Sequence, residues 1–344
     1  MICRKTPMLF FERKFPAILL LPLSWIYLAL ISLRNLLYDW RILRIHNVAL
    51  PVICIGNVRA GGTGKTPTVI YLANLLMQQR KRVAVLSRGY GRKTRGFRLA
   101  SDGESLQGSA EHVGDEPLLI ARRCPGVIVA VDEDRVRGAS RLVNNYEFDV
   151  ILLDDGYQHR RLHRDINILT MRASSPWGNG FALPAGPLRE SKHQGLQRAD
   201  LIWVNGTGEV DLKTSSPRIR ADYHPISLID DDAEFPVSSI AGKSIVAFCG
   251  IAEPASFYQT LHKLDAHLVE CFSFLDHHYY SLQDMQRIKK FVDKNNIEIV
   301  ITTQKDWVKL PDEIKLWKNW FALRVELVTK EENDVFQYIS HVFY

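Results

Sequence analysis

The chain has 344 residues, of which 46% are hydrophobic and 24% are charged, and its formal net charge is +6. This is ordinary globular composition without repeats or low-complexity tracts, and it is long enough for about two domains. The positive charge favours an anionic partner, such as nucleic acid, a phosphorylated ligand or a lipid surface, without choosing among them. The five cysteines form no CxxC pair, which argues against a zinc site.

The first feature along the chain is an apolar segment at residues 15–32, which contains no charged residue and has basic residues on both sides. A signal peptide would need a clean small-x-small cleavage site, which does not follow. A bilayer span would be at the short limit of length, and Pro22 interrupts it. We therefore predict a helix in the membrane interface, with its basic flanks on anionic lipid. A buried core helix remains the alternative.

A glycine-rich segment, GNVRAGGTGKTP, follows at residues 56–67, directly after the apolar run 52–55. Strand, glycine loop and helix in this order predict a phosphate site, because glycine allows close approach and the helix N-terminus is partly positive. Lys65 is expected to reach the β- and γ-phosphates, and the Thr66 hydroxyl to bind Mg²⁺. The expected ATP-binding residues are Gly61, Gly62, Thr63, Gly64, Lys65 and Thr66.

The match to the standard phosphate-loop pattern has one gap, since Arg59 stands where a glycine is expected. A plain glycine-rich turn that links strand to helix is the alternative. Partitioning-type ATPases share the GGxGKT half but carry a lysine where this chain has Ala60, which disfavours that subclass.

Strands and helices alternate after the loop, which predicts a parallel sheet covered by helices. We expect a membrane-associated helix in residues 1–45, a P-loop NTPase-like core in 46–165, and a second, smaller α/β domain in 166–310, with 311–344 packing back on the core. In the core, the expected helices are at 65–79, from 116 and at 133–144, and the expected strands are at 82–87, 127–131 and 149–154. In residues 166–310, the expected strands are at 166–170, 201–204, 244–249, 267–271 and 298–303, and the expected helices are at 254–264 and 282–294.

Acidic pairs stand at two points where they would meet the phosphate loop. Asp154 and Asp155 end a predicted strand and are candidate ligands of Mg²⁺ or its water. Asp155 and the glycine after it are also typical of a turn. In GDEP, Asp115 is a candidate catalytic base for a hydroxyl nucleophile, and an N-cap of the following helix is the alternative.

Basic and histidine side chains give further candidates. The loop SRGYGRKTRG at 87–96 suits a phosphorylated second substrate, while a solvated turn or a nucleic-acid patch remains open. Arg135 would neutralise a transferred phosphate or form a surface ion pair. His159 would bind substrate or be satisfied within its loop.

In the second domain, His277 of FLDHHYY either tunes Asp115 as a proton partner or is an ordinary loop histidine. The segment TTQKD at 302–306 is either a base-reading loop or a helix cap.

Taken together, GNVRAGGTGKTP, SRGYGR, GDEP, VDEDR, LLDDGYQH, LPAGPLRE, CGIAEP and DHHYY resemble the tetraacyldisaccharide 4'-kinase family in order and spacing. The resemblance implies a two-domain α/β enzyme at the cytoplasmic face of the inner membrane. It implies transfer of the γ-phosphate of ATP to the 4'-hydroxyl of a tetraacyldisaccharide 1-phosphate, giving lipid IVA. Leu275 and Gln304 depart from the family pattern.

By this resemblance, Asp115 is the base paired with His277, and Arg135 contacts phosphate. Glu116 and Asp154 would lie near the metal. Residues expected to face the disaccharide are Arg88, Tyr90, His159 and Arg189. No nucleic acid and no obligate protein partner are expected. The competing function is a membrane-bound P-loop ATPase switch that phosphorylates no acceptor.

Overall fold

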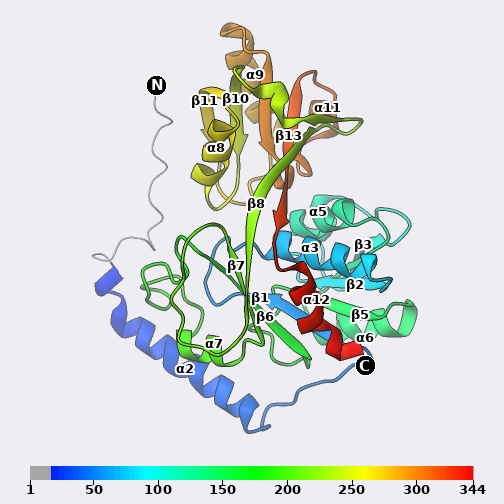
Figure 1. Cartoon of the computed structure of the whole chain (residues 1–344), viewed down its shortest axis with the longest axis vertical. Coiled ribbons are helices and arrows are strands. Elements are labelled where there is room, and N and C mark those ends of the chain that lie inside the picture. The colour runs from blue at the N-terminus through cyan, green and yellow to red at the C-terminus, as the bar shows by residue number, and fades with distance from the viewer. Residues whose placement is uncertain (1–16, 344) are drawn as a thin grey trace. The chain divides into compact units, whose positions relative to one another are not determined.

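The structure is a computed structural model that describes residues 17–343. Within them the chain forms two compact units, a larger one from residues 17–223 and 327–343 and a smaller one, His224–Glu326 (Figure 1). The first two residues of the predicted apolar segment, at positions 15 and 16, and the basic residues before them lie outside the described residues. The chain enters the smaller unit along one strand and leaves it along another.

A parallel sheet forms the centre of the larger unit, as predicted. Its inner strands are almost wholly apolar and buried on both faces, which is typical of strands covered by helices on both sides. The strand order is β3-β4-β2-β5-β1-β6-β7-β8. The strands are β1 (Val52–Gly56), β2 (Val83–Ser87), β3 (Arg98–Asp102), β4 (Ile128–Val131), β5 (Val150–Asp154), β6 (Ile166–Arg172), β7 (Leu201–Asn205) and β8 (Arg218–Ile229).

The sheet extends further than the sequence predicted. We expected residues 166–170 and 201–204 to begin a second domain, but β6 pairs in parallel with β1 and β7 pairs with β6. The boundary between the compact units therefore follows residue 223 instead of residue 165. The antiparallel edge strand β3 was not predicted, since its sequence RLASD is short and half polar.

Helices cover this sheet at positions close to those predicted. α3 packs on β1, β2 and β5, α5 packs on β3 and β4, and α6 packs on β2 and β4. The helices of this unit are α2 (Leu21–Asp39), α3 (Lys65–Gln78), α4 (Ala110–Val113), α5 (Asp115–Arg123), α6 (Arg135–Asn145), α7 (Lys192–Gln197), α12 (Glu332–Ser340) and the 3-10 helix η3 (His341–Phe343).

The amino-terminal helix α2 buries its polar side and exposes its apolar side. The Ser24 hydroxyl donates to the Ala182 carbonyl at 2.9 Å, and the Tyr27 hydroxyl donates to the Arg189 carbonyl at 2.8 Å. Asn35 is buried beside α7, next to which α2 runs in Figure 1. These contacts fix the helix to the larger unit through polar groups.

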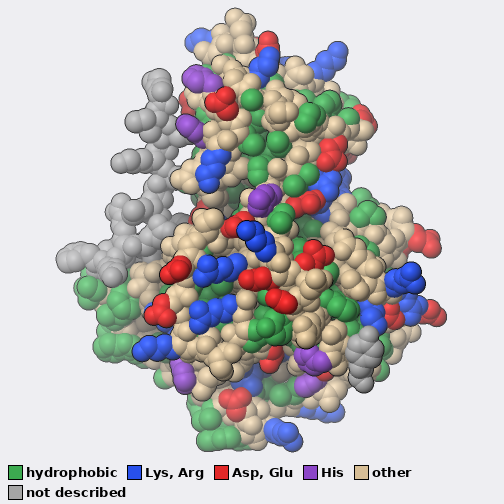
Figure 2. Space-filling model, viewed as in Figure 1, with side chains coloured by type: hydrophobic (Ala, Val, Ile, Leu, Met, Phe, Trp, Pro, Cys, Tyr) green, Lys and Arg blue, Asp and Glu red, His purple; other side chains and the backbone are tan. Residues whose placement is uncertain are grey.

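On its other side, α2 presents large apolar side chains to solvent, and Figure 2 shows apolar side chains along the edge where Figure 1 places it. This exposure excludes the alternative of a buried core helix. By length and composition α2 is apolar enough to cross a membrane, and 17% of its apolar window is buried. The exposed apolar residues of α2 and its flanks are Ile18, Leu19, Leu23, Trp25, Ile26, Leu30, Leu33, Leu36 and Trp40.

The smaller unit has its own parallel sheet in the order β11-β10-β12-β13, and β9 pairs antiparallel with β8. Two hydrophobic clusters, one on each side of β10, form its core. Its elements are β9 (Glu234–Pro236), η2 (Val237–Ile240), β10 (Ser244–Cys249), α8 (Pro254–Lys263), β11 (His267–Ser273), α9 (Leu282–Lys294), β12 (Ile299–Thr303), α10 (Gln304–Trp307), α11 (Asp312–Lys315) and β13 (Trp320–Val328). Of the predicted 311–344 tail, only the part from residue 327 belongs to the larger unit.

Candidate nucleotide and phosphoryl-transfer site

The glycine segment forms a tight loop between β1 and α3. Gly64 is the residue before α3 and has φ +87°, and Gly61 has φ +102°, conformations that glycine adopts without strain. A Cβ at Gly64 would collide with the Asn205 amide and the Tyr223 hydroxyl, so position 64 needs glycine for space as well. The loop thus ends at the amino terminus of a 14-residue helix, where backbone N–H groups have no partner within the helix.

Buried side chains hold this loop in place. The Asn57 amide donates to the Thr63 hydroxyl at 2.7 Å, and the Asn205 amide donates to the Thr63 carbonyl at 2.8 Å. The Thr63 and Thr170 hydroxyls lie 3.1 Å apart. Thr63 is therefore held by several buried side chains in the loop that also contains Gly61 and Gly62, while Thr66 is the second residue of α3.

Arg59, the departure from the usual pattern, has a structural role. It forms an isolated β-bridge with Leu188, and its guanidinium donates to the Ser175 carbonyl at 2.5 Å. The next residue, Ala60, donates its N–H to the Pro187 carbonyl at 2.7 Å. The glycine that the standard loop has here is replaced by a residue that fixes the loop to the LPAGPLRE segment.

Asp155 lies between two cations. Its Oδ1 is 3.6 Å from Lys65 Nζ and 3.1 Å from Arg189 Nη1. Burial acts to raise the pKa of Asp155, but Lys65 and Arg189 outweigh it and hold the pKa below its usual range. The residue has φ +49°, so the turn expected at Asp155 and the following glycine is present as well. The carboxylate keeps Lys65 and Arg189 at the phosphate loop.

Asp154 is buried and poorly compensated. Its Oδ2 accepts a hydrogen bond from the Ser87 hydroxyl at 2.8 Å, whereas Oδ1 is buried and has no partner among residues 17–343. Burial, together with the charges of Glu116 and Asp155, raises the pKa of Asp154. A cation placed there would relieve both costs, so the donor set fits Mg²⁺.

The described residues contain no ready-made cage of three or more histidine, cysteine or acidic ligands. This also fits Mg²⁺, which keeps several waters and takes one or two protein oxygens together with phosphate.

The GDEP segment packs against the basic loop. A Cβ at Gly114 would meet the backbone of Gly89 and Tyr90, and Gly114 itself has φ +96°. α5 begins at Asp115, whose buried carboxylate accepts the N–H of Glu116 at 3.0 Å. The capping position is Gly114, so the alternative of Asp115 as N-cap is wrong, although its carboxylate does accept one N–H of the first turn.

The basic loop divides into structural and exposed cations. Arg92 pairs with Glu133 at 2.5 Å and Lys93 with Glu111 at 2.7 Å, so these two cations are engaged in ion pairs within the unit. Arg88 and Tyr90 are exposed instead.

Arg135 begins α6 and is buried, which rules out the alternative of a surface ion pair. Its Nε has no hydrogen-bond partner among the described residues. Burial first, and then the charge of Arg88, lowers the pKa of Arg135, and Asp154 and Asp155 partly oppose this. The positive charges of Arg88 and Arg135 thus lie close enough to repel each other, and an anion bound between them would be stabilised by both.

His159 lies in the same electrostatic environment. Burial and the charge of Arg135 lower its pKa to about 4, so the imidazole is neutral near pH 7. Its Nε2 is buried and has no hydrogen-bond partner in the part of the chain that the structure describes. The unsatisfied nitrogen can accept or donate a hydrogen bond to a polar ligand.

His277 belongs to the smaller unit, where it follows β11. Its Nε2 lies 3.2 Å from Lys305 Nζ, and its backbone N–H donates to the Gly250 carbonyl at 3.2 Å. The TTQKD segment is a helix cap, because the Thr303 hydroxyl accepts the N–H of Asp306 at 3.1 Å at the start of α10. The pairing of His277 with Asp115 stays a prediction.

Several supporting residues were missed by the sequence analysis. Gln158 donates to the Asn57 carbonyl at 2.7 Å and accepts from Arg189 at 3.2 Å, so it connects the phosphate loop to the Asp155 pair. Ser87, Asn205 and Lys305 were missed too. Ser87, Asn205 and Lys305 end or follow a predicted strand, and this position could have marked them as candidates. Gln158 lies in the LLDDGYQH motif.

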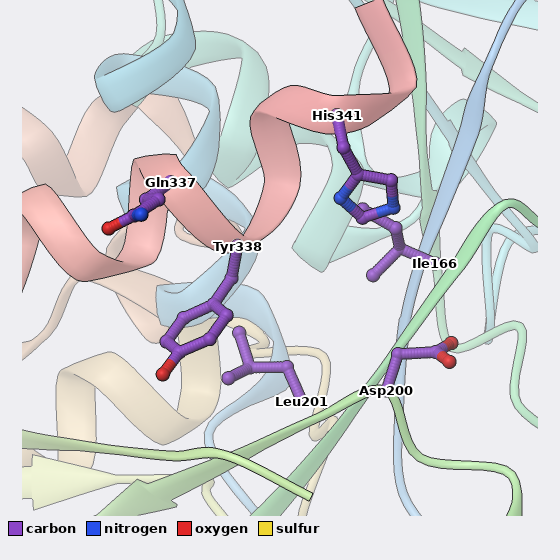
Figure 3. Close-up of a pocket in the computed structure, with 6 residues that line it drawn as sticks. All are labelled: Ile166, Asp200, Leu201, Gln337, Tyr338 and His341. Atoms are coloured by element: carbon purple, nitrogen blue, oxygen red, sulfur yellow. The ribbon is translucent and has the colours of Figure 1, made fainter.

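A cavity of about 400 Å³ lies elsewhere in the larger unit (Figure 3). Ile166 and Leu201, the first residues of β6 and β7, line it together with His341. It is therefore at the amino ends of the parallel strands, whereas the glycine loop follows the carboxyl end of β1. It is not part of the site described above.

Comparisons with known proteins bear on this geometry. A family model described as tetraacyldisaccharide-1-P 4'-kinase (LpxK) matches residues 16–344. The tetraacyldisaccharide 4'-kinase of Syntrophus aciditrophicus is 40% identical over 339 residues, which cover 92% of this chain and 91% of the relative. That of Aquifex aeolicus is 36% identical over 328 residues, covering 94% and 98%. The crystal structure of LpxK from Aquifex aeolicus in complex with ATP matches with a TM-score of 0.81 and 35% identity, over 95% of this chain and 99% of that one.

Proposed function

This chain belongs to the tetraacyldisaccharide-1-P 4'-kinase family, and from that premise we propose how its residues carry out the reaction. It is an ATP-dependent kinase of lipid A biosynthesis that phosphorylates the 4'-hydroxyl of tetraacyldisaccharide 1-phosphate to give lipid IVA. The observation that carries the assignment of residues is the braced glycine loop between β1 and α3, with Lys65 and Asp155 beside it.

The loop and its neighbours are assigned to ATP. Backbone N–H groups from Gly61 to Lys65 surround the β-phosphate, and the Lys65 ammonium contacts the β- and γ-oxygens. Thr66 and Asp154 would hold Mg²⁺, with Glu116 and Asp155 supporting it, because Asp154 has a buried oxygen without a partner among the described residues. Bound there, Mg²⁺ would neutralise charge on the phosphates.

The chemical step is assigned to residues of both units. Asp115 accepts the proton of the sugar hydroxyl, and His277 acts in the same proton transfer. The hydroxyl oxygen forms a bond to the γ-phosphorus as the bond to the bridging oxygen of ADP breaks. Arg135 and Arg88 stabilise the charge on the transferred group, consistent with the buried, unpartnered Nε of Arg135.

The acceptor is a lipid, and two features suit it. The residues assigned to the disaccharide are Arg88, Tyr90, His159 and Arg189. Of these, His159 offers a buried nitrogen that has no hydrogen-bond partner within residues 17–343. The exposed apolar face of α2 is assigned to the cytoplasmic side of the inner membrane, where it would keep the site near lipid headgroups. No nucleic acid or obligate protein partner is part of this proposal.

Replacement of the base tests the assignment. Asp115→Asn keeps size and polarity but removes the proton acceptor, so we expect kcat to fall by about 10²–10⁴-fold while ATP affinity is retained. Asp211→Asn, at an exposed position of the larger unit, is the matched control. Turnover of Asp115→Asn close to that of the control would refute the role of Asp115.

A further inference from the structure

Three loops meet at one edge of the sheet in the smaller unit. They follow β10, β11 and β12, which are parallel neighbours, so their carboxyl ends lie together. The first contains Gly250, the second Asp276 and His277, and the third leads into α10 with Lys305 and Asp306. His277 is thus surrounded by polar groups from three elements of the sheet.

A buried carboxylate ties these loops to one another. Asp306 is fully buried, and its Oδ2 accepts the N–H of Gly250 at 3.0 Å and the hydroxyl of Thr303 at 2.7 Å. Its Oδ1 lies 2.9 Å from the buried ammonium of Lys309. Buried ion pairs of this kind fix geometry more reliably than they add stability.

The turn that contains His277 is attached to these loops by hydrogen bonds. The backbone N–H of His277 donates to the Gly250 carbonyl, and the same N–H also donates to the Asp276 carboxylate at 3.1 Å. His277 has φ +61°, a left-handed conformation that costs a non-glycine residue about 1–2 kcal/mol. A residue held in such a conformation by its surroundings has a side chain with a fixed starting direction.

The contact with Lys305 then decides where the imidazole proton resides. Lys305 Nζ lies 3.2 Å from His277 Nε2 and 3.3 Å from Asp276 Oδ1. An ammonium group has donors and no acceptor, so a hydrogen bond to Nε2 requires the lone pair of that nitrogen. The competing contact, from Nε2 to Asp276 Oδ2, is longer at 3.8 Å. The proton of a neutral His277 therefore belongs on Nδ1.

We propose that Lys305 is a positioning residue that holds His277 in its neutral form with the proton on Nδ1. This rests on the proposed catalytic role of His277. Two charged groups of the smaller unit, Lys305 and Asp276, contact His277. The neighbouring His278 contacts Asp284 of α9 instead, at 3.1 Å. Lys305 and Asp276 push the protonation of His277 in opposite directions. The TTQKD segment thereby gains a role in proton transfer in place of base reading.

Opposite variants test this arrangement through the pH dependence of kcat/KM. Removing the cation in Lys305→Met should move the acid limb of the profile to higher pH by about one unit, because the negative charge of Asp276 is then no longer opposed by that of Lys305. Asp276→Asn should move the limb to lower pH. Lys305→Arg, which keeps a cation, should restore most of the wild-type profile. Lys294→Met, an exposed lysine of α9, is the matched control.

A second readout does not depend on activity. In the full-length protein labelled with ¹⁵N-histidine, and with His277→Gln to identify its signals, the shifts should show an unprotonated Nε2 in the wild type. In Lys305→Met the two tautomers should mix. A wild-type signal with the proton on Nε2 would overturn the proposal even if a variant failed to fold.

The proposed role of His277 and the proposed role of Lys305 can be refuted by different results. If His277→Gln retains wild-type turnover, the proposed role of His277 itself is wrong. If His277→Gln loses turnover but Lys305→Met and Asp276→Asn leave the acid limb in place, the role of Lys305 is refuted. A raised KM for ATP in Lys305→Met with an unmoved pH profile would likewise refute it, since it would make Lys305 a nucleotide contact.

Discussion

The two units share one architecture and differ in the loops that follow their strands. Each places loops at the carboxyl ends of parallel strands. In the larger unit the loop after β1 is rich in glycine and leads into a long helix, an arrangement that suits the binding of a phosphate by backbone N–H groups. In the smaller unit the loop after β12 leads into a four-residue helix whose start is capped by Thr303. The carboxyl ends of the strands thus carry a glycine-rich loop in the larger unit and a histidine in a fixed turn in the smaller unit.

The two units also differ in how the charged groups at these loops are paired. The larger unit buries charges that are only partly compensated, since Asp154 Oδ1 and Arg135 Nε have no hydrogen-bond partner among residues 17–343. The smaller unit surrounds His277 with paired groups, Lys305 and Asp276. Uncompensated charge indicates a ligand that brings the missing charge, whereas paired charge indicates positioning.

The largest effect is expected from the lysine of the cradle. Lys65→Ala removes the ammonium at the phosphates and leaves Asp155 with only Arg189, so both ATP affinity and kcat should fall, with kcat/KM reduced by about 10³-fold or more. Steady-state kinetics and calorimetry of ATP binding measure the two effects. Lys213→Ala, an exposed lysine in the same unit, is the control. Unchanged ATP affinity would contradict the assigned contact.

Two glycine substitutions sharpen the contrast between backbone strain and lost space. Gly64 and Gly206 both have φ +87°, but only Gly64 has neighbours that a Cβ would strike. Gly206→Ala should cost about 1–2 kcal/mol of unfolding free energy and leave ATP binding intact. Gly64→Ala should cost more and also abolish tight ATP binding. Chemical denaturation and ATP titration would separate the two; equal behaviour would contradict the described loop geometry.

Substitution of a third glycine, Gly250, tests whether the smaller unit affects kcat without affecting ATP affinity. A Cβ at Gly250 would lie 2.9 Å from the Leu275 carbonyl, beside the turn that carries His277. Gly250→Ala should therefore lower kcat by roughly 10-fold or more with little change in ATP affinity. Gly242→Ala, with open space around it, controls for unspecific destabilisation of this unit. A selective loss of ATP affinity would break the proposed division of roles.

The apolar face of α2 predicts a smaller, separable effect. Leu30→Gln combined with Leu33→Gln removes exposed apolar surface and should weaken binding to anionic vesicles by at least about 10-fold, because a leucine contributes up to about 1.5–3 kcal/mol when it is fully buried. The free energy of unfolding in solution should stay within about 0.5 kcal/mol. Ser24→Ala should lower the free energy of unfolding and leave vesicle binding unchanged, since the Ser24 hydroxyl accepts the Ala185 N–H inside the unit. Vesicle sedimentation and denaturation distinguish them.

A further effect concerns the dependence of stability on pH. The pKa of His159 is lowered to about 4 in the folded protein from 6.5, so the native state binds fewer protons than the unfolded state between these values. The stability contributed by the neutral form is complete above pH 6.5 and is lost as pH falls towards 4. His159→Gln should flatten this part of the curve of unfolding free energy against pH. An unchanged slope would contradict the burial of His159.

Much of the fold followed from local pattern. The buried runs of β1, β2 and β5 and the helices α3 and α9 were predictable, because continuous apolar strands and a marked helix start are local features. The unit boundary was not, since whether β6 and β7 pair with β1 or begin a new sheet depends on long-range pairing. The polar edge strand β3 carries too little apolar pattern to be recognised.

The site was predictable in part for the same reason. Motif spacing indicates Lys65 and Asp154, because their chemistry depends on a short loop or a strand end. Residues that act by touching another side chain, such as Gln158 on Arg189 or Lys305 on His277, become visible only when distant segments meet. Sequence reasoning can propose groups that have their own chemistry, but it misses the residues that contact and orient them.

One measurement tests the central claim most directly. Tetraacyldisaccharide 1-phosphate in mixed micelles is incubated with the full-length protein, Mg²⁺ and ATP labelled with ¹⁸O on the γ-phosphate, and lipid and nucleotide are analysed by mass spectrometry. The account predicts a labelled phosphoryl group on the disaccharide for each ADP formed. Label in inorganic phosphate with no gain of mass on the lipid would contradict it and would favour an ATPase switch.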